Sequence, residues 1–156
     1  MTKLTTIAAD QLQSTQGTKL GISPWIRLSQ SMVNQFADIA NDHQFIHIDP
    51  KRAGTESPFG GTIAHGFLTL SQLTQMAESK LAVIKDVRMS INYGFDRIRF
   101  ITPVRSDARV HAHFTLELAE ERTTGEWTLH HDITVEIEHN ERPALSAMWI
   151  IRQYTG

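Results

Sequence analysis

Cysteine is absent from this sequence of 156 residues, which excludes disulfides, thiolate metal ligands and cysteine nucleophiles. An excess of either charge is also lacking, because 15 Lys and Arg face 17 Asp and Glu, for a formal net charge of −2. A protein dedicated to nucleic acid normally carries a basic surplus, so that class is not favoured. The 40% hydrophobic and 21% charged content indicates an ordinary globular protein, long enough to form its own core.

Long hydrophobic runs are missing as well. Residues 57–77 carry no formal charge, but they are too rich in Ser, Thr, Gln and Gly to cross a bilayer. We expect this segment to be buried within the fold. The N-terminal residues lack the apolar stretch of a signal peptide, so we expect a cytoplasmic protein. No repeat or linker divides the chain, and we predict a single domain over residues 1–156.

A first helix is predicted to begin after Ser29 or Ser31, whose hydroxyls can accept hydrogen bonds from the free N–H groups of a first turn. Asn41 is expected to end it, because Asn tolerates the left-handed conformation found at helix ends. Before this helix we expect a loop around residues 17–21 and an extended piece over residues 25–28. The apolar stripe predicted for the helix consists of Met32, Phe36, Ile39 and Ala40.

A second helix is predicted from about residue 62 to residue 80, after an irregular segment over residues 43–61 that contains two prolines and a Gly-Gly pair. Gly66 is expected inside its first turns. An interior glycine costs roughly 0.5–1 kcal/mol relative to alanine, so a specific reason for this one is expected. The apolar positions predicted for this helix are Ile63, Phe67, Leu70, Leu73, Met76 and Ala77.

The hydrophobic period changes to two from residue 87 onward, which is typical of half-buried strands. We predict two extended pieces that flank Gly94 and a last strand over residues 144–153, with hairpin turns at residues 123–125 and 139–142. The alternating apolar positions between them are Val110, Ala112, Phe114, Leu116 and Leu118, then Trp127, Leu129, Ile133, Val135 and Ile137. The predicted fold class is α+β, with helices packed on one antiparallel sheet.

Three histidine pairs do not predict a metal site: His111 with His113, His130 with His131, and His43 with His47. The first pair shares the polar face of one strand, and we expect that face to be solvated. The second pair points to opposite faces of its strand. The third pair falls past the expected helix end and lacks the intervening glutamate of the zinc-protease motif. We therefore expect neither a metal nor another cofactor.

Asp42 and His47 stand five residues apart in a segment that leaves the first helix. A carboxylate and an imidazole that converge on one water can position it and exchange its protons. The spacing alone fits equally a helix-terminal loop with local hydrogen bonds. Gly66 also has two interpretations: its backbone N–H can stabilise a developing oxyanion, or the glycine serves only helix packing.

Two segments together resemble the MaoC-like dehydratases, the family of (R)-specific enoyl-CoA hydratases, and most closely the NodN-type branch. They are Asn41-Asp42-His43-Gln44-Phe45-Ile46-His47-Ile48-Asp49 and Phe59-Gly60-Gly61-Thr62-Ile63-Ala64-His65-Gly66. The runs Asn92-Tyr93-Gly94-Phe95-Asp96-Arg97-Ile98-Arg99-Phe100 and Thr102-Pro103-Val104 extend the similarity over roughly residues 30–110. Asn41 stands where the family usually has Gly, and Gln44-Phe45 stand where it usually has Asn-Pro. The second difference affects the expected acyl selectivity and fine geometry rather than the presence of Asp42 and His47.

The resemblance implies a hot-dog fold, in which a curved antiparallel sheet wraps a long central helix, and a homodimer that binds acyl-CoA near the interface. It implies reversible hydration of a trans-2-enoyl thioester to the (R)-3-hydroxyacyl thioester in fatty acid metabolism. Asp42 and His47 then hold the reacting water, and which of them is the base stays open because such a pair titrates as a unit. The Gly66 N–H polarises the thioester carbonyl.

The same resemblance assigns roles to further residues. Asp49 is expected to be a turn cap or a supporting residue, His65 to be structural, and Ser71 to line the acyl pocket. The candidates for the CoA phosphates are Arg88, Arg97, Arg99 and Arg105. Two alternatives remain: a hot-dog acyl-CoA thioesterase, and a non-catalytic module that binds acyl thioesters.

Overall fold

The structure, a computed structural model, describes residues 6–78, 81 and 83–156. The helical elements are η1 (Ala9–Gln11), η2 (Gln13–Thr15), α1 (Gln30–Ala40), α2 (Phe45–Ile48), α3 (Pro50–Glu56), α4 (Gly66–Ser71) and α5 (Leu73–Ala77). The strands are β1 (Thr6–Ile7), β2 (Thr18–Ile22), β3 (Ile26–Arg27), β4 (Val83–Ile84), β5 (Val87–Phe100), β6 (Arg109–Thr123), β7 (Glu126–Ile137) and β8 (Leu145–Thr155).

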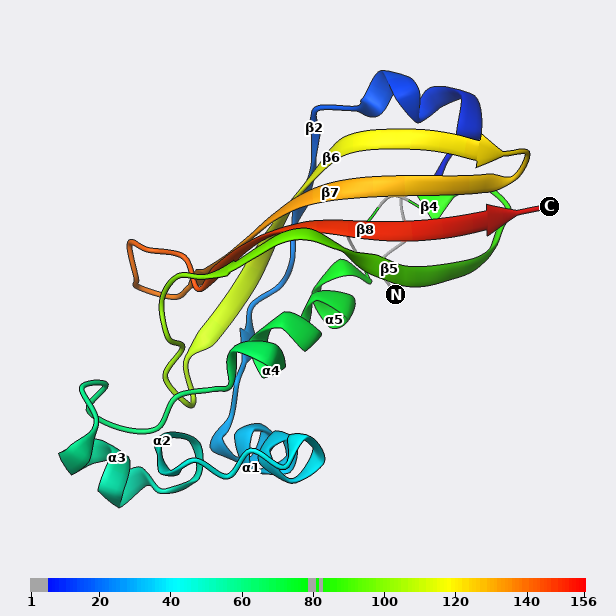
Figure 1. Cartoon of the computed structure of the whole chain (residues 1–156). Coiled ribbons are helices and arrows are strands. Elements are labelled where there is room, and N and C mark those ends of the chain that lie inside the picture. Colours follow the sequence, from blue (N-terminus) through cyan, green and yellow to red (C-terminus); the bar gives the residue numbers. More distant parts are fainter. Residues whose placement is uncertain (1–5, 79–80, 82) are drawn as a thin grey trace.

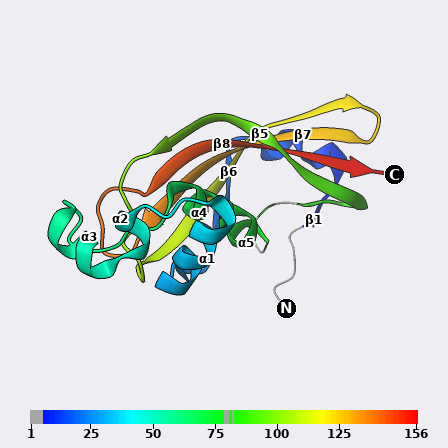
Figure 2. The same cartoon turned by 60° about the horizontal axis from the view of Figure 1, so that its bottom comes forward.

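One curved antiparallel sheet dominates the molecule (Figure 1). Its strand order is β2-β6-β7-β8-β5, and β3 also pairs with β6. In Figure 2 the sheet arches over α4 and α5, while α1, α2 and α3 lie beyond them. The predicted α+β class, with helices on one antiparallel sheet, is confirmed.

The main core fills the space between the concave face of the sheet and the helices. Alternate residues of β6 and β7 are buried, as their period of two predicts. They meet Val33 of α1, Leu68 of α4, and Leu73 and Met76 of α5 in one cluster. A smaller cluster around Leu12 packs the N-terminal turns against the other end of β6 and β7. The uncharged segment is thus central to the fold, as expected.

Helix α1 has the predicted caps, and of the predicted stripe Met32 and Phe36 pack against the core. The Ser29 hydroxyl accepts a hydrogen bond from the backbone N–H of Met32 at 3.2 Å, and Asn41 closes the helix in the left-handed region with φ 52°. Ile39, however, is 83% exposed, and Val33 and Ala37 are buried instead. Ile39 was assigned to the wrong face. The buried face runs through Val33 and Ala37, which directly follow Met32 and Phe36 in sequence.

Two segments predicted to be irregular are ordered elements. Residues 43–61 contain α2 and α3, and Pro50 is the first residue of α3 rather than a helix breaker. Asp49 is the N-cap of α3 and accepts a hydrogen bond from the Arg52 N–H at 3.0 Å, which confirms its capping role. Residues 17–21 lie mostly in β2, which pairs with β6.

The central helix begins later than predicted. Residues 62–65 are not helical, and α4 starts at Gly66. Gly66 is therefore the first residue of the helix and not an interior one. The helix is divided at Gln72 into α4 and α5, and the predicted end at residues 79 and 80 lies outside the described residues.

The two predicted strand pieces around Gly94 form a single strand, β5, which pairs with β8 throughout. The glycine sits at a register irregularity between Asn92 and Gly94 and does not end the strand. The later strands and both hairpin turns lie where the sequence predicts them, within two residues. Among the described helices none is long and apolar enough to cross a membrane.

Candidate active site

Asp42 is positioned by the way α1 ends. Asn41 turns the chain through the left-handed region, and the N–H of Asp42 donates a hydrogen bond to the Ala37 carbonyl at 3.0 Å. Asn is one of the few residues that adopt this conformation readily. The turn leads Asp42 away from the helix, with a half-buried side chain.

His47 is held in one orientation by the neighbouring chain. It lies in α2, and the Nδ1–H of its ring donates to the Ile63 carbonyl at 2.8 Å. The N–H of Ile63 in turn donates to the Ile46 carbonyl at 2.9 Å, so the two segments are joined twice. Because the carbonyl can only accept, Nδ1 carries the proton, and Nε2 of neutral His47 is left as an acceptor.

Gln30, which the sequence did not mark as functional, joins three segments around His47. Its side-chain N–H donates to the His47 carbonyl at 2.7 Å, and its side-chain oxygen accepts from the Thr62 hydroxyl at 2.5 Å. The start of α1 is thereby tied both to α2 and to the chain before α4. No sequence signal identifies this role, since it depends on residues far apart along the chain.

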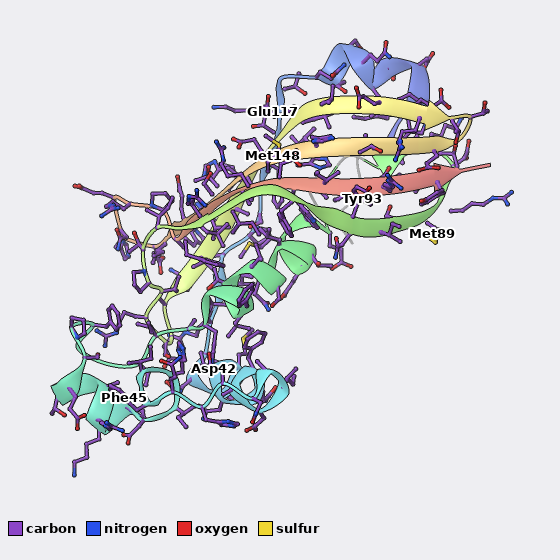
Figure 3. All side chains as sticks on the ribbon, in the orientation of Figure 1. Asp42, Phe45, Met89, Tyr93, Glu117 and Met148 are labelled. Atoms are coloured by element: carbon purple, nitrogen blue, oxygen red, sulfur yellow. The ribbon has the colours of Figure 1, made fainter. Side chains whose placement is uncertain are left out.

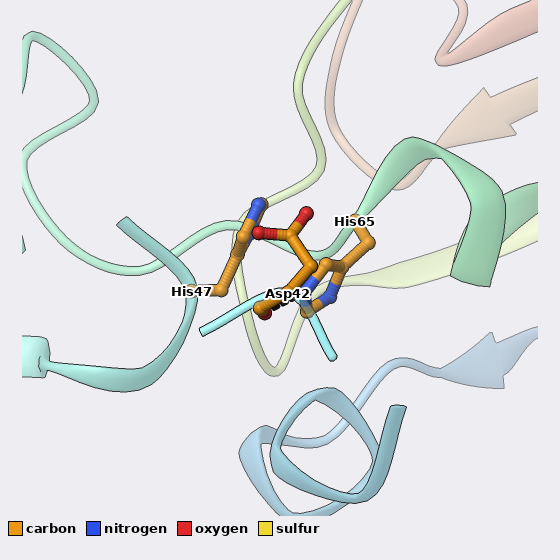
Figure 4. Close-up of side chains that lie close together, drawn as sticks. All are labelled: Asp42, His47 and His65. Atoms are coloured by element: carbon orange, nitrogen blue, oxygen red, sulfur yellow. Dashed lines mark hydrogen bonds between the residues drawn. The ribbon is translucent and has the colours of Figure 1, made fainter. Parts of the chain in front are cut away.

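His65 was predicted to be structural, and it directly contacts both proposed catalytic residues. Its Nε2–H donates to the backbone carbonyl of Asp42 at 3.0 Å. Its ring stacks on that of His47, with centroids 3.7 Å apart and 23° between the planes. One ligating atom from each of Asp42, His47 and His65 lies within 4.8 Å of the other two (Figure 4). His65 therefore supports the Asp42 and His47 pair. In the sequence, its position directly before Gly66 is what could have indicated a place near the site.

Burial sets the charge of His47. It lowers the pKa of His47, and nearby His65 acts in the same direction, while the hydrogen bond to Ile63 and the Asp42 carboxylate oppose the change. The net direction is downward, so His47 is neutral at pH 7. A neutral imidazole beside a carboxylate can accept a proton from water.

A cavity of about 370 Å³ opens beside His47. His47 and Gly66 both contribute to its wall, which is otherwise mainly apolar; its other lining residues are Ile63, Ala64, Thr69, Phe100, Ile101, Thr102, Pro103, Val104 and Ala144. Asp42 is not among the described lining residues, but one of its carboxylate oxygens lies within 4.8 Å of a ring nitrogen of His47. The sequence had singled out neither Phe100 nor Thr69 as part of a site.

Gly66 approaches an aromatic ring closely. A Cβ at this position would lie 3.0–3.2 Å from atoms of the Phe100 ring, which is tighter than ordinary van der Waals contact. As the first residue of α4, Gly66 has a backbone N–H without an intrahelical acceptor. The glycine thus leaves a donor and free space in the wall of the cavity.

Ser71 does not line this cavity. Its hydroxyl donates to the Leu68 carbonyl at 2.7 Å, and Ser71 contributes instead to two other cavities at the far end of α4. The prediction placed it one to two turns beyond Gly66 in a longer helix. Because α4 begins at Gly66 and ends at Ser71, the side chain lies at the opposite end of the helix.

The four predicted CoA-phosphate arginines are not gathered at one place. Arg88 is at the start of β5, and Phe100 is at its end. At about 3.3 Å per residue, the strand separates the two residues by roughly 40 Å. The Arg97 guanidinium lies 3.8 Å from the Asp132 carboxylate of β7. The Arg99 guanidinium donates a hydrogen bond to the backbone carbonyl of Ile98. The structure does not bring these three to the cavity.

Arg105 is the exception. It follows Val104 of the cavity wall, and its guanidinium donates to the Phe59 carbonyl beside Gly60 and Gly61. This contact holds the guanidinium beside the segment that leads to Ile63 and Ala64 of the wall. His43, considered above with His47, is exposed and bonds to Asp38 at 2.9 Å.

The MaoC like domain model matches residues 11–137, which is most of the chain. This chain belongs to the MaoC-like family. Nodulation protein N of Rhizobium meliloti (strain 1021) is 50% identical over 144 residues, covering 92% of this chain and 89% of that protein. The 3-hydroxyacyl-thioester dehydratase Z of Mycobacterium tuberculosis (strain H37Rv) is 41% identical over 141 residues, covering 90% and 92%.

A solved structure of the family has the same fold. The (R)-hydratase from A. caviae involved in PHA biosynthesis aligns with a TM-score of 0.67 at 23% identity, covering 87% of this chain and 94% of that one. The hot-dog fold expected from the resemblance is confirmed, with one qualification: the wrapped helix is shorter than expected and is divided into α4 and α5. As a MaoC-like protein, the chain belongs to a family of hydratases and dehydratases.

Proposed function

We propose that this protein catalyses the reversible hydration of a trans-2-enoyl thioester to the (R)-3-hydroxyacyl thioester. The observation that carries the proposal is the neutral His47, fixed in one tautomer, beside the Asp42 carboxylate and at the wall of a cavity that also contains Gly66. The similarity to a 3-hydroxyacyl-thioester dehydratase supports the substrate class.

In this mechanism one water lies between the Asp42 carboxylate and the His47 imidazole. A carboxylate oxygen and a ring nitrogen of the pair lie within 4.8 Å of each other, a separation that suits a bridging water. One of the two removes a proton as the water oxygen adds to C3. A proton is delivered to C2 on the same face, so that H and OH of a single water are added across the double bond. The reaction balances without an electron acceptor, and we expect it to need no cofactor.

The Gly66 N–H would donate to the thioester carbonyl and stabilise the enolate-like charge that develops when oxygen attacks C3. Gly66 has no side chain that could shield its N–H from the thioester, and the atoms nearest to the position of a Cβ belong to the Phe100 ring. Arg105 is the proposed partner for a phosphate of the carrier, because it directly follows Val104 of the cavity wall. The acyl chain would then lie in the apolar part of the cavity wall.

We also propose a homodimer formed through β5. This strand pairs with β8 on one side, and no described residue pairs with its other edge. Met89 and Tyr93 lie along it and are about half exposed (Figure 3). Phe100 at its end is equally exposed, and Phe67 of α4 is 67% exposed. An unpaired edge with exposed apolar side chains is a surface that proteins usually cover. A monomer mass in light scattering at micromolar concentration would reject the dimer.

The deciding experiment is an assay with crotonyl-CoA. Hydration of the double bond is expected to decrease the ultraviolet absorbance of the conjugated enoyl thioester. It is not expected to release free CoA thiol. Thiol release at a comparable rate would replace this proposal with a thioesterase. The absence of both signals, with crotonyl-CoA and with a longer enoyl-CoA, would leave a binding protein. The Asp42→Asn, His47→Gln double variant serves as the inactive control.

A further inference from the structure

A second cluster of titratable side chains lies on the outer face of the sheet, away from the cavity. His111 and His113 project from β6, and Glu136 projects from β7 directly opposite His111. The Nε2 atoms of the two histidines lie 2.9 Å and 3.2 Å from the same carboxylate oxygen, Oε2 of Glu136. One ligating atom from each of the three lies within 4.8 Å of the other two.

These separations suit a metal ion. Two ligand atoms that are each about 2.0 Å from a tetrahedral centre are about 3.3 Å apart, close to both observed spacings. Two imidazoles and one carboxylate are a ligand set that takes Zn²⁺ and related first-row divalent ions. The sequence showed only the two histidines on one strand, and two ligands do not make a site. The third ligand comes from the adjacent strand.

The two histidines are held ready for a ligand. The Trp25 ring stacks on the His111 ring, with centroids 3.6 Å apart and 10° between the planes, and this contact leaves the His111 side chain 12% exposed. The Nε2 atom of His113 is also buried, and the Oε2 atom of Glu136 lies 3.2 Å from it. Both Nε2 atoms are therefore held toward the same carboxylate oxygen.

The neighbouring charges do not oppose a cation. The nearest cationic side chain along β6, Arg109, is engaged with Glu138 through two hydrogen bonds. The Glu136 side chain is about half exposed and directs one oxygen, Oε2, at both imidazoles. The cluster therefore offers a carboxylate and two imidazoles on rigid strands.

We propose that His111, His113 and Glu136 form a binding site for a divalent transition-metal ion such as Zn²⁺, separate from the hydration site. The ion would take the Nε2 atoms of both histidines and the Glu136 carboxylate, and water would complete its coordination. Its position beneath Trp25 links the sheet to the chain that leads through β3 into α1. The site would thus join the N-terminal segment to the sheet.

The test is calorimetric titration of the full chain with Zn²⁺, using protein without a polyhistidine tag and previously treated with a chelator. One strongly bound Zn²⁺ per chain is expected at this site. His113→Gln and Glu136→Gln should each weaken it at least ~100-fold, because losing even a supporting residue of a metal site costs about 10–100-fold in affinity. Melting curves in chelator would confirm that both variants are folded.

Two control variants separate this site from other histidines. His139→Gln removes a histidine that is 91% exposed, and it should leave Zn²⁺ binding unchanged. His47→Gln removes a member of the buried Asp42, His47 and His65 cluster, and it should also leave binding unchanged. The proposal is overturned if the native chain binds no Zn²⁺, if His113→Gln binds it normally, or if binding disappears in His47→Gln.

Discussion

Two clusters in this molecule have the same composition, two histidines and one acid, and their surroundings differ. Asp42, His47 and His65 lie beneath the sheet at the cavity, with both rings nearly inaccessible to water. His111, His113 and Glu136 lie on the outer face, with the carboxylate half exposed. Burial lowers the pKa of His47, whereas the outer histidines lower the pKa of Glu136 by hydrogen bonding to it.

The difference shows that the surroundings of a cluster, more than its residue types, determine its chemistry. In the inner cluster each histidine donates one N–H to a backbone carbonyl, which fixes the ring and its tautomer. Such fixed groups suit proton transfer. In the outer cluster both Nε2 atoms face the same carboxylate oxygen, an arrangement suited to binding a cation.

The largest expected effect is the loss of hydration when the inner cluster is altered. Asp42→Asn and His47→Gln nearly preserve shape but remove proton transfer, an effect typically worth about 10²–10⁴-fold. The double variant should be little slower than either single one, because both residues act on one water. His111→Gln is the matched control in the outer cluster and should retain native turnover of crotonyl-CoA. Full activity in either inner variant would remove that residue from the mechanism.

Gly66→Ala tests the cavity wall beside the inner cluster. The methyl group would press on the Phe100 ring in the cavity wall and so hinder the approach of the thioester oxygen to the Gly66 N–H. Losing one oxyanion donor typically slows turnover about 10²–10³-fold. The melting temperature should change little, because Gly66 begins α4 and the half-exposed Phe100 can shift.

Gly54→Ala provides the matched glycine control. Gly54 is also helical, and an added Cβ there meets no atom within 4 Å. This change should raise stability slightly, by up to about 1 kcal/mol, without altering turnover. If Gly66→Ala instead melts far lower and keeps its turnover per folded molecule, the glycine serves packing alone.

His131 extends the comparison to a histidine that is buried without a catalytic role. Burial lowers its pKa to about 4, so the folded protein keeps it neutral where the unfolded chain, at its ordinary value of 6.5, binds a proton. Stability should therefore rise with pH between about 4 and 6.5, by up to about 3 kcal/mol. His47 adds to this slope in the same direction.

Urea unfolding at several pH values measures this slope, with His131→Leu as the comparison. The variant should lose most of the pH dependence between pH 4 and 6.5, whatever its absolute stability. An unchanged slope would mean that His131 is already protonated in the folded protein.

The smallest effect is expected from the outer cluster in the absence of metal. Glu136→Gln should change the free energy of unfolding by less than about 1 kcal/mol at neutral pH, because the ion pairs are partly exposed and screened by salt. Since the pKa of Glu136 is lowered on folding, this contribution should decline as the pH falls through the carboxylate range. A larger loss in chelator would indicate tighter packing of the carboxylate than its exposure suggests.

Local rules predicted much of the fold from sequence. The caps at Ser29 and Asn41, the alternation along β6 and β7, and both hairpin turns depend on nearby residues. The errors occurred where partners are distant. The chain at 17–21 is a strand only because β6 pairs with it, and Gly94 continues β5 because β8 absorbs an irregularity there.

The site was predictable to the same extent. Asp42, His47 and Gly66 were predicted from the resemblance to the MaoC-like family, and the structure places His47 and Gly66 at one cavity with Asp42 adjacent to His47. Gln30 and Phe100 carry no local signal, because their contacts with His47 and Gly66 cross long stretches of sequence. The CoA-phosphate arginines stay predictions, and the structure adds only that the four are spread along β5 and the segment after it.

The double connection between Ile46–His47 and Ile63 has a consequence for how the protein can vary. Because two hydrogen bonds join these points directly, the chain between them forms a closed loop whose length does not set the position of His47. Doubling the length of a flexible loop costs only about 0.6 kcal/mol in closure entropy. The exposed end of α3, from Gly54 to Glu56, is thus a place where insertions can accumulate, or be engineered, while His47 keeps its position.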